Sequence, residues 1–217
     1  TPIMSGVIKF SDNKSIDTYS FSLTNANPDR LIITDEKISW HHNGENKPYE
    51  INLEPEYKES ALAESTNPTT KIIFQMLSSC KVYQFHDSSE AGPLRQVCPV
   101  ETANYLQSHG NNLPSFLLFL RDNYKNSYNR IVDYVRDVVP QFQDFYLETT
   151  NNFISLRWMD NSATDYRFNA YQFSDGSIRF IALATLLLQP PQTMPNVIIL
   201  DEPELGLHPY AITQLAE

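Results

Sequence analysis

The fold of this chain is indicated most clearly by F-S-D-G-S-I-R at Phe173–Arg179 and V-I-I-L-D-E-P-E-L-G-L-H-P at Val197–Pro209. The Ser-Asp-Gly turn predicts the start of a helix, where free backbone N–H groups and the positive end of the helix dipole favour an anion. The run Val197–Leu200 has the uninterrupted apolar character of a strand buried on both faces. Asp201 and Glu202 follow it directly, at the carboxyl end where open α/β sheets bind ligands.

The turn residues Ser174, Asp175 and Gly176 have two interpretations. In one, serine adds a hydroxyl donor and glycine leaves room for a phosphate to approach the backbone. In the other, the turn is an ordinary helix N-cap. The helix is predicted to run to Gln189, and it has hardly any polar face, so we expect it to be buried.

The adjacent carboxylates of Asp201 and Glu202 also have two interpretations. Carboxylates at the end of a buried strand are costly unless a metal or hydrogen-bond donors neutralise them. Mg²⁺ needs one or two carboxylates, and a second carboxylate can orient an attacking water. The alternative is a solvated pair that caps the next element. His208, before Pro209, is equally compatible with a loop residue and with a functional one.

The composition is that of a globular protein, with 217 residues, 41% apolar and 19% charged. A net charge of −10 argues against a basic nucleic-acid clamp, and no Lys/Arg run indicates DNA binding, which stays open. Cys80 and Cys98 form no C-x-x-C and are expected to be reduced thiols, with a disulfide or metal role as the alternative. No apolar run reaches the roughly 18 residues of a membrane span and no signal peptide is visible, so we expect a cytoplasmic location.

Short strand-like runs separated by polar clusters occupy the first part of the chain and predict an antiparallel meander. Asn43-Gly44 is a strong signal for one of its turns. The expected strands are Val7–Phe10, Tyr19–Leu23, Leu31–Thr34, Lys37–Trp40 and Tyr49–Leu53.

Helical and strand patterns alternate further along. A turn is expected at Asn151-Asn152, and neither G-x-x-x-x-G-K-[ST] nor G-x-G-x-x-G occurs. The expected helices are Glu56–Glu64, Thr69–Ser79, Pro114–Asn123 and Ser127–Val139, and the expected strands are Lys81–Phe85, Phe142–Thr149, Phe153–Met159 and Tyr166–Asn169.

These motifs, in this order, resemble the second half of an ABC-type ATPase head, and more narrowly the RecF/SMC-like predicted bacterial ATPases of the AAA group. In that family the signature reads S-D-G-[ST]-x-R, and the strand end reads [DE]-E-P-E-x-G-L-H-P. This chain has S-D-G-S-I-R at Ser174–Arg179 and D-E-P-E-L-G-L-H-P at Asp201–Pro209. Its G-N-N-L at Gly110–Leu113 resembles the family's G-S-N-L element. The resemblance is specific over about Lys81–Glu217 and vague before that.

The resemblance implies an α/β fold of the P-loop NTPase, ABC-ATPase-like class, present only in part. It divides the chain into an antiparallel β subdomain with the following helices at 1–80, and a helical lobe with connecting strands at 81–170. The signature helix, the Walker B strand and the D-loop would then occupy 171–217.

The resemblance also implies ATP and Mg²⁺ as cofactors. Asp201 would hold Mg²⁺, usually through water, as the Walker B aspartate, and Glu202 would polarise the hydrolytic water as general base. The turn Ser174–Gly176, with Asp175, would contact the γ-phosphate of ATP held mainly by a second subunit. The expected partner is therefore a second head, bound through the signature and the D-loop.

The D-loop is expected at Leu205–His208, and His208 is counted among the residues that contact the cofactor. Two family elements are absent, namely the phosphate-binding loop with its Lys and Ser/Thr, and the strand with the switch histidine. The chain begins at Thr1 and stops within a predicted helix. We therefore expect a piece of a longer ATPase, which by itself binds ATP weakly or not at all and is inactive.

Two other classes stay open. The parent could be an overcoming-lysogenization-type nuclease with this ATPase head, acting in DNA repair or phage defence. Alternatively, the chain could be a non-catalytic interaction domain. Retention of both Ser174–Gly176 and Asp201–Glu202 argues against the second class, because neither has an evident packing role in the sequence.

Overall fold

The computed structural model describes residues 3–11, 15–26, 30–42, 47–54 and 59–216. The chain divides into two compact units, Thr1–Ser79 and Cys80–Glu217. Each unit has its own cluster of buried apolar side chains. Among the described residues, no helix is both long enough and apolar enough to cross a bilayer.

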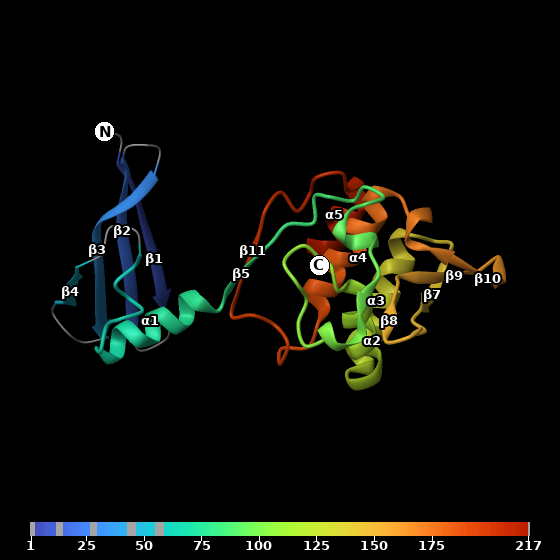
Figure 1. The fold of residues 1–217 in the computed structure, drawn as a ribbon, viewed down its shortest axis with the longest axis horizontal. Coiled ribbons are helices and arrows are strands. Elements are labelled where there is room, and N and C mark those ends of the chain that lie inside the picture. The colour runs from blue at the N-terminus through green and yellow to red at the C-terminus, as the bar shows by residue number, and fades with distance from the viewer. Residues whose placement is uncertain (1–2, 12–14, 27–29, 43–46, 55–58, 217) are drawn as a thin grey trace. The chain divides into compact units, whose positions relative to one another are not determined.

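The N-terminal unit is built on a four-stranded antiparallel sheet, and the predicted meander is confirmed (Figure 1). Strands that are neighbours in the sequence pair with one another, in the order β1-β2-β3-β4. The turn predicted at Asn43-Gly44 lies outside the described residues. The strands are β1 (Ile3–Ser11), β2 (Ser15–Ala26), β3 (Arg30–His42) and β4 (Tyr49–Leu53).

One strand, β3, replaces the two predicted at Leu31–Thr34 and Lys37–Trp40, and this prediction was wrong because a buried carboxylate was not foreseen. Glu36 stays in the strand with only 1% of its surface exposed. Its carboxylate accepts hydrogen bonds from Tyr19 Oη at 2.7 Å, from the backbone N of Ala61 at 2.9 Å and from Ser60 Oγ. A buried carboxylate with three donors is satisfied, so the polar interruption does not end the strand.

The same carboxylate explains why the helix predicted at Glu56–Glu64 is wrong in its described part. Residues 61–64 form a turn instead. The N–H of Ala61 donates to Glu36 rather than to a carbonyl of a helix. The next predicted helix is confirmed as α1 (Pro68–Ser78), which begins after an Asn67 cap.

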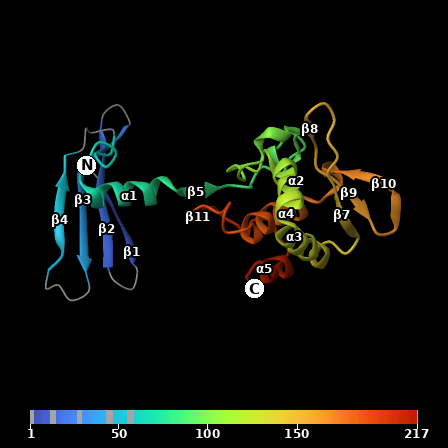
Figure 2. The ribbon, with the colours of Figure 1, turned by 90° about the horizontal axis from the view of Figure 1, so that it is seen from below.

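The C-terminal unit combines helices with short sheets (Figure 2). Its helices are α2 (Leu113–Asn123), α3 (Lys125–Val138), α4 (Asp175–Leu188) and α5 (Pro209–Ala216), with 3-10 turns η1 (Pro93–Arg95), η2 (Val100–Thr102) and η3 (Ala170–Gln172). Its strands are β5 (Cys80–Tyr83), β6 (Cys98–Pro99), β7 (Phe142–Tyr146), β8 (Phe153–Ile154), β9 (Arg157–Asp160), β10 (Ala163–Asn169) and β11 (Val197–Leu200). The two predicted lobe helices are confirmed as α2 and α3.

Helix α4 forms the centre of this unit, as its all-round apolar sequence predicts. Figures 1 and 2 both place it beside α3, and residues of the two helices belong to one buried cluster. Phe180 and Ile181 of α4 are completely buried. A helix of this kind is stabilised by packing more than by helix propensity.

The sheet β10-β9-β7 packs an aromatic row against this centre. Phe145, Trp158 and Phe168 are cross-strand neighbours on one face. Trp158 also stacks on Phe173 with 4.7 Å between ring centroids, directly before the helix α4. The strand predicted at Phe153–Met159 is divided into β8 and β9, because β8 pairs with β6 and β9 pairs with β7 and β10.

The turn predicted at Asn151-Asn152 is confirmed. Both residues have positive φ angles, 49° for Asn151 and 65° for Asn152. Asparagine tolerates this left-handed region better than most residues, which explains the pair at this position.

The burial of the strand β11 differs from the prediction. It pairs with β5 in parallel, and Ile199 lies opposite Val82. These two side chains are 47% and 45% exposed, whereas Ile198 and Leu200 pack against the core. The expected burial on both faces was therefore wrong, because in the described chain this sheet has two strands and one covered face.

Candidate functional site

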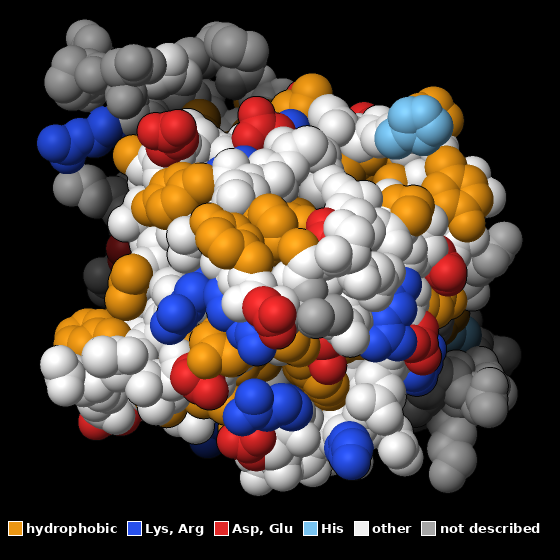
Figure 3. Space-filling view, turned by 90° about the vertical axis from the view of Figure 1, so that its right-hand side faces the viewer, with side chains coloured by type: hydrophobic (Ala, Val, Ile, Leu, Met, Phe, Trp, Pro, Cys, Tyr) orange, Lys and Arg blue, Asp and Glu red, His pale blue; other side chains and the backbone are white. Residues whose placement is uncertain are grey.

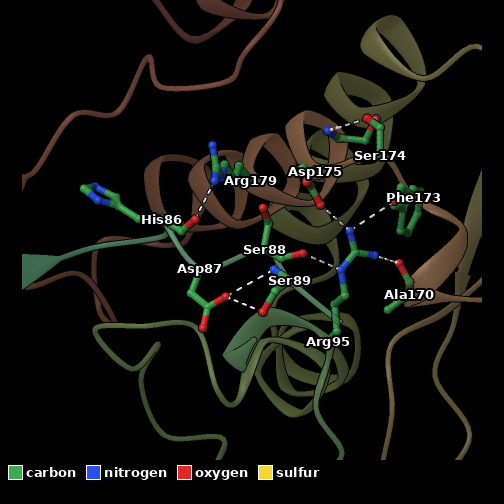
Figure 4. A network of polar contacts seen from close by, with 11 residues as sticks. His86, Asp87, Ser88, Ser89, Arg95, Ala170, Phe173, Ser174, Asp175 and Arg179 are labelled. Carbon is green, nitrogen blue, oxygen red and sulfur yellow. Dashed lines mark hydrogen bonds and ion pairs between the residues drawn. The ribbon is translucent and has the colours of Figure 1, made fainter. Parts of the chain in front are cut away.

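The signature turn begins helix α4 with a side-chain cap. Ser174 Oγ accepts a hydrogen bond from the backbone N of Ser177 at 3.0 Å, and the two hydroxyl oxygens lie 2.8 Å apart (Figure 4). The ordinary N-cap interpretation of Ser174 is therefore confirmed. Ser174 and Asp175 are both exposed at this helix start, where the dipole is positive.

Gly176 has a packing role that the sequence does not reveal. A Cβ at Gly176 would lie 2.6 Å from the carbonyl oxygen of Gly206, a separation that real side chains do not adopt. Glycine is therefore needed for the close approach of α4 to the loop after β11. The expectation that this turn has no packing reason for its residues was wrong, because contacts between segments far apart in sequence are invisible in a motif.

Asp175 forms an ion pair that the sequence did not predict. Arg95 Nη2 lies 2.9 Å from Asp175 Oδ1. The Arg95 side chain is only 4% exposed, whereas that of Asp175 is 67% exposed. The position of Arg95 in a Pro- and Gly-containing segment carries no signal of this role, because its partner is 80 residues away.

Asp201 and Glu202 lie at the carboxyl end of the parallel pair, as predicted, and both are exposed. The backbone N of Asp201 donates to Tyr83 O at 3.3 Å, which extends the pairing of β11 with β5 by one step. The two carboxylates therefore leave the sheet at the edge where parallel strands present ligand-binding residues.

Two residues that follow β5 hold Asp201, and the sequence reasoning missed both. Gln84 Nε2 donates to Asp201 Oδ2 at 3.1 Å, and His86 Nε2 lies 2.8 Å from Asp201 O. The available signal was their position at the end of the strand predicted at Lys81–Phe85, but its pairing with β11 was not predicted. The carboxyl ends of neighbouring parallel strands meet at one edge of a sheet.

Glu202 has a left-handed backbone, with φ 42°. This conformation is uncommon for residues other than glycine, and such strained residues cluster at functional sites. A turn follows at once, in which Leu205 N donates to Glu202 O at 3.1 Å. The chain therefore changes direction sharply directly after the strand β11.

Arg179, the last residue of the signature, connects the two motifs. Its Nη1 donates to Leu205 O at 2.9 Å and its Nη2 donates to His86 O. It therefore ties α4 to the loop after β11 and to the segment that contacts Asp201. Figure 4 shows the contact of Arg179 with His86 near the Arg95–Asp175 pair.

The segment after β5 carries a third carboxylate, Asp87. Ser89 donates to Asp87 Oδ1 through its Oγ at 2.6 Å and its backbone N at 3.2 Å. These hydrogen bonds lower the pKa of Asp87 below its ordinary 3.8, and the nearby positive charge of Arg179 acts in the same direction. Asp87 is therefore ionised at neutral pH.

The space between these groups is too small to enclose a nucleotide. A cavity bounded by Phe85, Arg179, Leu183 and Asp201 encloses about 10 Å³, the room of a single water molecule. A ligand would therefore have to approach Asp201 and Glu202 from the exposed surface. Two exposed carboxylates suit a divalent cation that is already bound to the phosphates of its substrate.

The carboxylates fit Mg²⁺ that keeps most of its other ligands. Among the described residues, no three His, Cys, Asp or Glu side chains form a complete metal cage. Mg²⁺ is ordinarily held by one or two carboxylates together with water and substrate phosphates. Asp201 and the adjacent Glu202 supply that number of carboxylates without enclosing the site.

His208 lies at the start of α5. Its Nδ1 accepts a hydrogen bond from the backbone N of Tyr210 at 3.3 Å, and its carbonyl oxygen accepts from Ile212 N at 3.2 Å. It is exposed and caps the helix, as a loop histidine would. The structure brings the start of α4 into contact with the segment Leu205–His208 through Gly206 and Leu205. Among the described residues, His208 forms no hydrogen bond with either carboxylate.

Surface charge around the unit is mixed. On the face shown in Figure 3, Lys and Arg side chains alternate with Asp and Glu and with apolar side chains. A nucleic-acid clamp would present a broad surface of positive charge. This face has no such character.

Comparison with known proteins identifies the family. One family model matches residues 8–217, nearly the whole chain, and its description is that of an AAA domain, with the AbiEii toxin and the type IV toxin–antitoxin system named beside it. A comparison with curated proteins found no match. The match supports a P-loop ATPase-type domain with a mixed α/β fold, in agreement with the helices and sheets described above. The chain thus belongs to this family of AAA domains.

Proposed function

We propose that this chain is part of an ATP-binding and ATP-hydrolysing head of the ABC, RecF/SMC-like type, which dimerises around ATP and Mg²⁺. The AAA domain family supports nucleotide binding and ATPase function in general. The phosphate-binding loop, which this sequence lacks, would come from another part of the full-length protein. The chain alone would then be inactive.

Asp201 and Glu202 carry this proposal. They follow a parallel strand, they are exposed, and Gln84 and His86 hold Asp201 in place. In the proposed reaction Asp201 positions Mg²⁺, usually through water, and Glu202 orients and deprotonates the attacking water. The bound cation would neutralise charge on the transferred phosphate.

The turn at Ser174–Gly176 would act on a neighbouring head. Ser174 and Asp175 are exposed at the positive end of α4, which suits the γ-phosphate of ATP held mainly by a second copy. Leu205 in the proposed D-loop and Tyr210 just after it are 45% and 49% exposed. Their exposure is compatible with an interface between two heads, at which His208 would also lie.

Replacing Glu202 tests the proposal. In the full-length protein, Glu202→Gln should abolish ATP hydrolysis while ATP binding persists, so that an ATP-bound dimer accumulates in size-exclusion chromatography with light scattering. Glu204→Gln is the matched control, because Glu204 is an exposed carboxylate two residues further along. Turnover that survives Glu202→Gln would show that Glu202 is not the base.

A non-catalytic interaction domain is the second candidate function. The packing of Gly176 is compatible with it, because this contact needs no catalytic activity. Because Gly176 approaches Gly206 and Asp175 pairs with Arg95, both residues would be retained for structure even in a head without activity. The two candidates differ in turnover. A full-length protein that binds its partner normally but hydrolyses no ATP would support the second.

A further inference from the structure

Arg95 is a buried cation at the centre of four hydrogen bonds (Figure 4). Its Nε donates to Ser88 O at 2.8 Å, and its Nη1 donates to Ala170 O. Its Nη2 donates both to Phe173 O at 3.2 Å and to Asp175 Oδ1 at 2.9 Å. The Arg95 side chain therefore connects Ser88, before η1, to residues 170–175 at the start of α4.

Three of these acceptors lie within six residues of one another, around the start of α4. The guanidinium group is planar and its donors have fixed directions, so it sets the relative positions of acceptors that share it. Ala170 O, Phe173 O and Asp175 Oδ1 are therefore held in one arrangement. The signature turn follows Phe173 directly and takes its position from them.

The unequal burial of Arg95 and Asp175 indicates that Arg95 positions the turn as well as stabilising the fold. A buried arginine is costly, and among the described residues the carboxylate partner of Arg95 is Asp175, whose side chain is 67% exposed. Asp175 thus links the buried guanidinium to the surface where the turn would meet a phosphate.

Arg95 could act on either of two sites. His86, in the same segment, contacts Asp201 O, so a change at Arg95 could reach the carboxylates of its own head. The direct contacts of Arg95, however, go to Ser88, to the two carbonyl groups just before the turn and to Asp175 within it, and none goes to Asp201 or Glu202. The contacts favour the turn.

We propose that Arg95 is a positioning residue for the Ser174–Gly176 turn, and that it thereby serves the ATP bound by the neighbouring head and not the one at its own Asp201. This inference rests on the proposed function, in which the turn acts across a dimer. Asp175 is the side chain through which Arg95 holds the exposed end of the turn.

Kinetics of single variants give the first test in the full-length protein. Arg95→Lys keeps the buried charge but lacks the planar fork, and Asp175→Ala removes only the exposed partner, so it should fold. Misplacement of a reacting group by about 1 Å lowers turnover by roughly 100-fold. We expect kcat to fall by this order for Arg95→Lys, and by less for Asp175→Ala, with the Kd for ATP unchanged. Full activity of both variants would overturn the proposal.

A mixture of two variants tests whether Arg95 serves the ATP bound by the neighbouring head or the ATP bound by its own head. Arg95→Lys heads are combined with Glu202→Gln heads, each nearly inactive alone. In a mixed dimer, one composite site has a normal Glu202 from the Arg95→Lys head and a normal turn from the other head. Random pairing of a two-fold dimer should then restore roughly a quarter of the wild-type turnover. A defect confined to folding would give no such recovery.

A mixture of Ser174→Glu with Glu202→Gln is the control, because the added carboxylate would repel a phosphate at the turn directly. Recovery in both mixtures supports the role of Arg95. Recovery with Ser174→Glu but not with Arg95→Lys would overturn that role while leaving the shared site standing. Recovery in neither mixture would overturn the shared site and, with it, the role of Arg95.

Discussion

Gly176 lies against the carbonyl oxygen of Gly206, so closely that a Cβ at Gly176 would be 2.6 Å from that oxygen. The first turn of α4 and the loop after β11 are therefore in contact at a point where only glycine fits. Arg179 closes the same contact by donating to Leu205 O at 2.9 Å. A displacement of the first turn of α4 would therefore displace the loop after β11, and the reverse also holds.

A methyl group at Gly176 tests this contact. Gly176→Ala should lower the free energy of unfolding of the chain by about 1–3 kcal/mol, as overpacking does, because the obstructing atom belongs to the backbone. Thermal unfolding without nucleotide is the measurement, and Tyr171→Ala, at an exposed residue just upstream, is the control. If glycine served only the approach of a phosphate, stability without nucleotide would not change.

The affinity of the isolated chain for ATP tests whether the two motifs suffice. A cavity of about 10 Å³ lies between Arg179 and Asp201, and the sequence has no phosphate-binding loop. We therefore expect a Kd for ATP above about 1 mM, which corresponds to a binding free energy weaker than about 4 kcal/mol. Isothermal titration calorimetry with Mg²⁺ and ATP measures it. Micromolar binding would contradict the expectation, and loss of that binding in Asp201→Asn would then assign it to this site.

The buried Glu36 should control the stability of the N-terminal unit. Glu36→Gln replaces an acceptor-only group by one that carries donors opposite Tyr19 Oη and Ala61 N, and we expect a loss of about 1–3 kcal/mol. Hydrogen exchange should accelerate in β2 and β3 and stay unchanged in α4, which belongs to the other unit. Glu50→Gln, at the exposed Lys37 pair, is the control and should have little effect.

The pKa of Asp87 is lowered by Ser89, so the ionised carboxylate is favoured in the folded chain. The stability that this provides is present above the unfolded pKa, near 3.8, and is lost as the pH falls through the lowered folded value. Ser89→Ala should raise the pKa of Asp87 toward 3.8, which an NMR titration of its carboxyl carbon would detect. Glu90→Gln should leave this titration nearly unchanged.

Local patterns were sufficient for most of the elements. The meander, α1, the lobe helices and α4 follow from alternation, from 3.6-residue periodicity and from caps, all of which act between residues close in sequence. The positions of Asp201 and Glu202 at a strand end followed in the same way. The errors occurred where a distant partner decides the outcome, as Glu36 does for β3 and for residues 61–64.

The sequence by itself determined the start of α4 at Ser174, the strand before Asp201 and the turn at Asn151-Asn152, because caps, apolar runs and left-handed asparagines are local. Only the tertiary structure decided that Gly176 packs against Gly206 and that Arg95 holds Asp175. It also decided that Gln84 and His86 reach Asp201. These contacts join residues 30 to 117 positions apart, and their energies depend on three-dimensional distance, which the order of residues does not encode locally.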